Sequence, residues 1–73
     1  MKLVAEIAGS PRRFEIRSEE MRDGDHTHEW FRVYVYEDGR AVDDFIHHTL
    51  TYAKERAEAK YAVPRTAWRV VEE

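Results

Sequence analysis

The fold of this chain is decided by residues 23–46, whose sequence is DGDHTHEWFRVYVYEDGRAVDDFI. The dipeptides Asp23-Gly24 and Asp38-Gly39 are favoured in two-residue β-hairpin turns. Between them, residues 30–36 alternate with the period of two that is typical of a strand with one buried face. The stretch therefore predicts an antiparallel strand with a hairpin at each end.

A third turn, at Gly9-Ser10, extends this pattern toward the N-terminus. Each turn, taken literally, pairs apolar residues of neighbouring strands, and an error of one residue would scatter them over both faces. The predicted strands cover residues 2–8, 12–22, 26–37 and 40–47. The predicted pairs are Leu3 with Ile16, Ala5 with Phe14, Phe14 with Val33, Ile16 with Phe31, Val35 with Val42 and Phe31 with Ile46.

One aspartate does not fit this pattern. The register that follows the Asp38-Gly39 turn directs Asp44 toward the apolar face of the sheet. A β-bulge, or a position at the end of the strand, would account for it.

A helix is predicted after these strands. Thr49 is a suitable N-cap and Pro64 a suitable stop, so the helix is expected at roughly 50–62. Its apolar stripe, at three- and four-residue spacing, consists of Leu50, Ala53, Ala57 and Tyr61. Residues 66–71 are predicted to form a last strand with Trp68 and Val70 directed inward. This strand runs antiparallel to the first strand or parallel to the fourth.

The predicted fold is therefore α+β: a four-stranded antiparallel meander, one helix packed on one face and a final strand, in the order ββββαβ. A chain of 73 residues has room for one core, so residues 1–73 are expected to form a single domain. The residues expected to be buried are Leu3, Phe14, Ile16, Phe31, Val33, Val35, Ile46, Leu50, Ala57 and Trp68.

The composition excludes several classes of function. The chain has no cysteine, which rules out disulfides and thiolate metal sites, and its net charge of −3 gives no general attraction for nucleic acid. No apolar run approaches the roughly 18 residues of a membrane helix, and no apolar signal core forms near the N-terminus. We expect a cytoplasmic protein that does not associate with membranes.

The face of the meander opposite the helix carries aromatic and arginine side chains in alternation. In the predicted register Arg17 lies opposite Trp30, and Arg13 lies opposite Tyr34, so guanidinium groups can stack on rings. Glu15, Asp43, Phe45 and His47 are expected beside them. The predicted binding residues are Arg13, Arg17, Trp30, Arg32, Tyr34 and Tyr36.

This surface suits contact with another protein or with a second copy of the chain, because aromatic and arginine side chains are enriched among interface residues. Stacking of single-stranded nucleic acid on the rings is a further alternative, which the acidic net charge disfavours. A solvated sheet face laced by cross-strand pairs, such as Glu6 with Arg13, is the remaining interpretation.

The histidines provide the alternative function. His26 and His28 are two residues apart on a strand, which is a spacing used by zinc ligands. The predicted register places His47 diagonal to His28. A zinc site formed by His26, His28 and His47 is therefore the alternative hypothesis.

Catalysis is not expected. The sequence holds no glycine-rich phosphate loop, and its serines and threonines lie outside nucleophile motifs. The prediction is a small non-catalytic binding or adaptor module that needs no cofactor.

Overall fold

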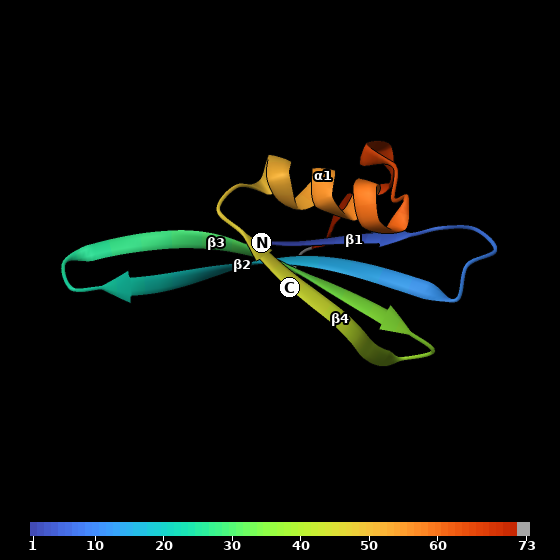
Figure 1. The fold of residues 1–73 in the computed structure, drawn as a ribbon, viewed down its shortest axis with the longest axis horizontal. Coiled ribbons are helices and arrows are strands. Elements are labelled where there is room, and N and C mark those ends of the chain that lie inside the picture. Colours follow the sequence, from blue (N-terminus) through green and yellow to red (C-terminus); the bar gives the residue numbers. More distant parts are fainter. Residues whose placement is uncertain (72–73) are drawn as a thin grey trace.

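The computed structural model describes residues 1–71, and Figure 1 shows a helix lying across one face of a sheet. The described elements are β1 (Lys2–Glu6), β2 (Arg12–Asp23), β3 (His26–Glu37), β4 (Arg40–His47), α1 (Leu50–Tyr61), a 3₁₀ turn η1 (Arg65–Ala67) and β5 (Arg69–Val71). The predicted α+β class and the element order ββββαβ are confirmed.

The last strand lies beside the first. The strand order is β4-β3-β2-β1-β5, and β5 pairs antiparallel with β1, with Val70 opposite Leu3. β5 is shorter than the predicted 66–71, because η1 occupies the first part of that segment. Trp68 is half-buried and packs against the core as predicted, whereas Val70, on this edge strand, is 65% exposed.

The β2–β3 hairpin is displaced by two residues from its predicted register, whereas the β1–β2 pairs are as predicted. The turn is centred on Gly24-Asp25 rather than on Asp23-Gly24, and Gly24 takes the positive φ of 60° that a turn with glycine first requires. An even displacement keeps every side chain on its predicted face. The observed pairs are Phe14 with Val35 and Ile16 with Val33.

β4 contains a bulge at Val42 that the predicted register lacks. The Asp38-Gly39 turn lies where the sequence predicts it, but Val42 is then inserted between the partners of Tyr36 and Val35. The insertion reverses the faces of the rest of β4. The predicted partners of Val35 and Phe31 are therefore wrong, and the observed pairs are Val35 with Asp43, Val33 with Phe45 and Phe31 with His47.

Because of the bulge, five side chains of β4 lie on the face opposite to the predicted one. Asp44 lies on the sheet face away from the helix, which removes the exception in the pattern. Ile46 lies on that face too and is half-buried instead of belonging to the core. Asp43, Phe45 and His47, which were predicted on the open face, lie on the helix side.

The core lies between the sheet and α1. Ala53 and Ala57 have no exposed surface, so their small side chains let the helix approach the sheet closely. Thr49 caps the helix as predicted, because its Oγ1 accepts the N–H of Tyr52 at 3.1 Å. Of the residues predicted to be buried, Leu3, Phe14, Ile16, Val33, Val35 and Ala57 are buried, whereas Phe31, Leu50 and Trp68 are half-buried against the core.

Asp43 joins β4 to α1. Its Oδ2 accepts hydrogen bonds from Lys60 Nζ at 2.7 Å and from Tyr61 Oη at 2.6 Å. The bonds from Lys60 and then from Tyr61 lower the pKa of Asp43. The bond to Asp43 raises the pKa of Lys60 and that of Tyr61. The bulge creates this contact, since it turns the Asp43 side chain toward the helix.

We expect Asp43 to make the protein less stable in acid. A carboxyl group whose pKa is lowered by folding stabilises the protein above its ordinary pKa of 3.8, and this contribution disappears as the pH falls through the folded value. The raised pKa of Tyr61 affects stability in alkali. Its contribution to the free energy of unfolding is lost as the pH rises through a value above 10.0. Denaturant unfolding of the wild type and Asp43→Asn tests the acid effect. The stability difference between them at neutral pH should shrink near pH 2, and an equal difference at both would contradict it.

The β2–β3 hairpin projects beyond the rest of the sheet (Figure 1). β1 pairs with β2 as far as Arg17, and β4 pairs with β3 as far as Phe31, so neither strand accompanies the hairpin further. We call residues 19–30 the arm, of which residues 20–29 are exposed. The described chain measures 46 × 22 × 22 Å, and its radius of gyration of 12.7 Å exceeds the roughly 11 Å of a compact chain of this length.

Candidate contact surface

The outer face is the side of the sheet opposite α1, and no other helix or strand of residues 1–71 lies over it (Figure 1). The alternation of β2 and β3 brings the predicted binding residues together there, namely Arg13, Arg17, Trp30, Arg32, Tyr34 and Tyr36. Their pairing differs from the prediction because of the displaced turn. Arg17 lies opposite Arg32 instead of Trp30, and Arg13 lies opposite Tyr36 instead of Tyr34.

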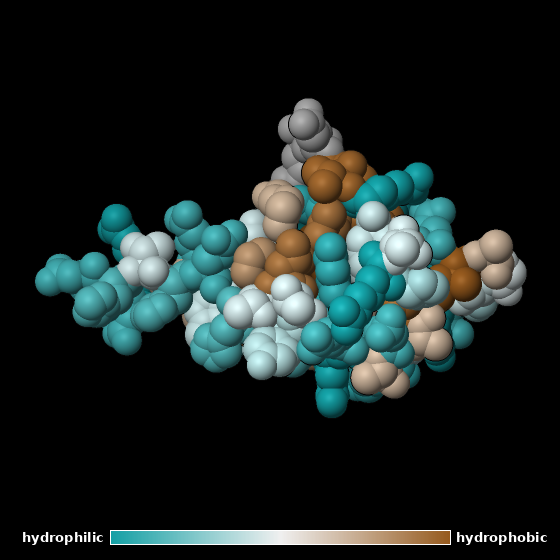
Figure 2. All heavy atoms as spheres, turned by 90° about the horizontal axis from the view of Figure 1, so that it is seen from above, coloured by the Kyte–Doolittle hydropathy of each residue, from teal (hydrophilic) through white to brown (hydrophobic). Residues whose placement is uncertain are grey.

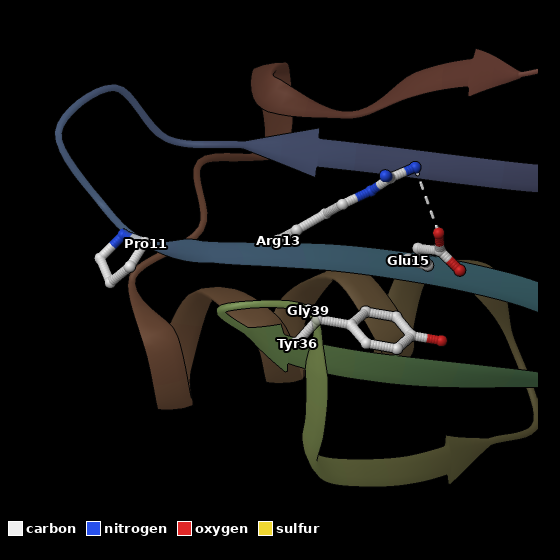
Figure 3. Close-up of a pocket in the computed structure, with 5 residues that line it drawn as sticks. All are labelled: Pro11, Arg13, Glu15, Tyr36 and Gly39. Atoms are coloured by element: carbon white, nitrogen blue, oxygen red, sulfur yellow. Dashed lines mark ion pairs between the residues drawn. The ribbon is translucent and has the colours of Figure 1, made fainter.

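Glu15 organises the part of the outer face formed by β1 and β2. Its side chain is almost fully buried, and its carboxylate lies 3.5 Å from Lys2 Nζ, 3.2 Å from Arg13 Nη2 and 3.0 Å from Arg17 Nη2. Figure 3 shows the ion pair of Arg13 with Glu15. We call these four residues the basic cluster. Its net charge is +2, since Lys2, Arg13 and Arg17 contribute +3 and Glu15 contributes −1.

Arg32 links the neighbouring strands across the middle of the outer face. Its Nε donates to Glu19 Oε1 at 3.0 Å, and its Nη1 donates to Asp44 Oδ2 at 2.7 Å. Tyr34 Oη donates to the same Glu19 oxygen at 3.2 Å. The bonds to Glu19 and Asp44 raise the pKa of Arg32, and burial followed by the bond to Glu19 raises the pKa of Tyr34. Both groups therefore remain protonated at neutral pH, and the network persists.

The aromatic rings of the outer face are held by contacts with their neighbours. The ring centroids of Trp30 and His48 lie 4.0 Å apart, and those of Tyr34 and Tyr36 lie 6.3 Å apart at an interplanar angle of 25°. The guanidinium carbon of Arg17 lies 5.5 Å from the centroid of Tyr34. Stacking of arginine on a ring therefore occurs, although on a different ring from the one predicted.

The outer face is hollowed beside Tyr36 and again beside Trp30. A hollow of about 330 Å³ is lined by Pro11, Arg13, Glu15, Tyr36 and Gly39, and Figure 3 shows the Tyr36 ring lying along the sheet below Arg13. A second hollow of about 560 Å³ lies where the arm leaves the sheet, and is lined by Met21, Arg22, Asp23, His28, Trp30 and His48. The rings thus border recesses that another molecule can enter.

The predicted zinc ligands are not brought together. His26 and His28 are exposed on the arm with ring centroids 6.4 Å apart, whereas the bulge places His47 on the helix side of the sheet. His47 Nε2 is buried and has no hydrogen-bond partner among the described residues. Within residues 1–71, no group of three or more His, Cys, Asp or Glu side chains is positioned to hold a metal ion.

Sequence reasoning missed Lys2, Glu19 and His48 as members of the surface. It also treated Glu15 as one flanking charge, although Arg13 and Arg17 lie two residues to either side of it. That spacing places all three β2 side chains in one row and could have indicated the basic cluster. The contacts of Glu19 and His48 depend on the displaced turn and on the bulge, which the sequence did not specify.

Comparison with protein-family models, with curated proteins and with solved structures finds no match for this chain. In the described part of the chain, no helix combines the length and the apolar character needed to cross a membrane.

Proposed function

We propose that this chain is a non-catalytic binding module whose outer face makes contact with another protein. The observation that carries the proposal is the row of half-buried rings of Trp30, Tyr34 and Tyr36 on a sheet face that no element of residues 1–71 covers. Such rings leave apolar area in water, which contact with a partner would remove. Tryptophan, tyrosine and arginine are also the residues that most often dominate interface energies.

The contacts that hold the side chains of the outer face support the same proposal. Arg32 and Tyr34 are hydrogen-bonded to Glu19, and Trp30 is packed against His48. Side chains that are already fixed before binding lose less conformational entropy when a partner arrives. Binding through the outer face therefore costs little side-chain conformational entropy.

The charge arrangement favours a protein over a nucleic acid. The guanidinium groups of Arg13, Arg17 and Arg32 already contact the carboxylates of Glu15, Glu19 or Asp44 on the same face. A phosphate backbone would have to displace these carboxylates and would meet a chain with a net charge of −3. A protein partner carries both signs of charge and can pair with donors and acceptors alike.

We expect the double substitution Trp30→Ser with Tyr34→Ser to weaken partner binding at least tenfold, or about 1.4 kcal/mol, because it removes both rings from the middle of the surface. The measurement has two arms. Light scattering over a range of concentrations detects a second copy, and capture on the immobilised chain followed by titration of the captured protein measures a different partner.

Tyr52→Ser is the matched control, since it removes a tyrosine that is 62% exposed on the helix side. The control should bind as the wild type does. Equal binding by the wild type and the double variant would refute the proposal. A third outcome is that the wild type binds single-stranded RNA, that this binding weakens steeply with salt, and that the double variant has lost it. This outcome would show that the partner is a nucleic acid and not a protein.

A further inference from the structure

The arm is acidic, and apart from Glu19, which is paired with Arg32, its carboxylates form no ion pair within the described residues. Residues 19–30 contain Glu19, Glu20, Asp23, Asp25, Glu29 and Arg22, so five negative charges and one positive charge give a net charge of −4. Asp23 lies on the outer face, whereas Glu20 and Glu29 lie directly opposite each other on the helix side, where like charges repel. On the side that carries the helix, Figure 2 shows the surface of the projecting hairpin as almost entirely hydrophilic. An isolated two-stranded ribbon of this kind is only marginally stable.

The basic cluster is the complementary surface. It carries a net charge of +2, and the side chains of Arg13 and Arg17 are 48% and 44% exposed beside the buried Glu15. Arg69 lies opposite Val4 on the same face and forms a long ion pair with Glu6, at 3.9 Å, so these two residues add no net charge. The outer face therefore has a basic part over β1 and β2, and its extension along the arm carries the carboxylates of Glu19 and Asp23 next to the Asp25 turn.

The arm cannot reach the basic cluster of its own chain. Both lie on β2, which runs as one strand from Arg12 to Asp23, so the two regions are successive parts of the same ribbon. Their lengths match, since Glu19 to Asp23 and Arg13 to Arg17 each span about 14 Å at ~3.4 Å per residue. A second copy that lies antiparallel across the outer face would bring each arm onto the other copy's basic cluster.

We infer that the partner is a second copy of this chain, with the outer faces together and each acidic arm across the basic cluster of the other copy. This inference rests on the proposed function of the outer face. The contact is reciprocal, as the interface of a two-fold dimer must be. When Asp23 of one copy lies over Glu15 of the other, the two-fold axis passes halfway between them, near Glu19 and its cross-strand partner Trp30. The largest ring of the outer face then lies at the centre of the interface, where binding energy concentrates.

Exchanging the charges tests the inference by light scattering or sedimentation equilibrium. The face variant, Arg13→Glu with Glu15→Gln and Arg17→Glu, makes the cluster acidic. The arm variant, Asp23→Lys with Asp25→Lys, makes the tip of the arm basic, since the net charge of residues 22–25 changes from −1 to +3. We expect the wild type to approach twice its monomer mass of 8.7 kDa as concentration rises. Each variant should dimerise at least tenfold more weakly by itself, because like charges then meet at both contacts. An equimolar mixture should recover the dimer, since both contacts become attractive again.

Two controls make the result specific. Lys54→Glu with Arg56→Gln changes the net charge by −3, as the face variant does, but on the helix, and it should dimerise as the wild type does. Circular dichroism and a cooperative melting transition check that each variant is folded. If the face variant fails this check, Arg13→Glu replaces it, because that side chain is 48% exposed.

A wild type that stays monomeric up to millimolar concentration, or a mixture of folded variants that does not recover the dimer, would overturn the second copy as the partner. Either result leaves the proposed function standing if Trp30→Ser with Tyr34→Ser still abolishes capture of a different protein. If that double variant changes neither assembly nor capture, the outer face itself is not the contact surface.

Discussion

Replacing Phe14 by alanine is expected to lower the free energy of unfolding by about 3–5 kcal/mol. The Phe14 side chain is 1% exposed and packs in a cluster with Ala5, Val35, Ala57 and Val63. It lies where β2 meets both of its neighbouring strands and the helix, so the cavity cannot close without moving the sheet. A domain of this size has a total stability of roughly 4–11 kcal/mol, so the variant loses a large part of it.

Urea unfolding followed by circular dichroism measures the loss. Phe31→Ala is the matched control, because Phe31 is half-buried beside the arm and packs against the edge of the core. Its loss should be clearly smaller. Equal losses for the two variants would contradict the corrected register, in which Phe14 lies at the centre of the core and Phe31 at its margin.

Glu15→Lys is expected to lower the free energy of unfolding by about 2–4 kcal/mol. The change places a fourth cation at a nearly buried position among Lys2, Arg13 and Arg17. The estimate is below the cost of a fully buried unpaired charge, since Arg13 and Arg17 reach water and can turn away. The same change should also weaken the inferred dimer, because repulsion by the introduced lysine would move the Arg13 and Arg17 side chains away from their positions on the outer face.

Glu6→Lys is the control for this prediction. Glu6 lies on the outer face too, but its side chain is 58% exposed and its ion pair with Arg69 is long, at 3.9 Å. We expect this change to alter stability by less than about 0.5 kcal/mol. Comparable losses for Glu15→Lys and Glu6→Lys in thermal unfolding would show that Glu15 does not organise the outer face.

The alternation of apolar residues in β1, β2 and β3 was sufficient to predict the two faces of the sheet. The displaced turn did not disturb them, because a displacement of two residues preserves the face of every side chain. The turn could not be located from sequence, since Asp23-Gly24 and Gly24-Asp25 are both favourable dipeptides and either one connects the same strands. In the observed register Val33 and Val35 lie opposite Ile16 and Phe14, and all four are buried.

The fourth strand shows where sequence patterns become insufficient. Asp44 signalled a bulge, but not its position, and the bulge at Val42 decides which of Asp43 and Asp44 meets the helix. Asp43 gains Lys60 and Tyr61 as partners, and Asp44 gains Arg32. These contacts of the two carboxylates form only in the tertiary structure, so the periodicity of the sequence could not predict them.

The candidate site was predictable in composition but not in its contacts. The alternation on β3 was sufficient to predict that Trp30, Arg32, Tyr34 and Tyr36 share a face. The projecting arm was not foreseen, because its length follows from where β1 and β4 stop pairing. His47 was assigned to the zinc hypothesis on a register that the bulge changes, and it lies on the opposite side of the sheet from His28.

The chain carries two tryptophans, which provide the most direct test of the central claim that the outer face is a contact surface between copies. Trp30 lies on the outer face at the centre of the inferred dimer, whereas Trp68 packs against the core from the other side, with its Nε1 buried. Two-dimensional ¹H–¹⁵N spectra recorded from micromolar to millimolar concentration give a separate indole signal for each. The inferred dimer predicts that the Trp30 signal moves with concentration while the Trp68 signal stays in place. Movement of the Trp68 signal with a stationary Trp30 signal, or constant positions of both, would contradict it.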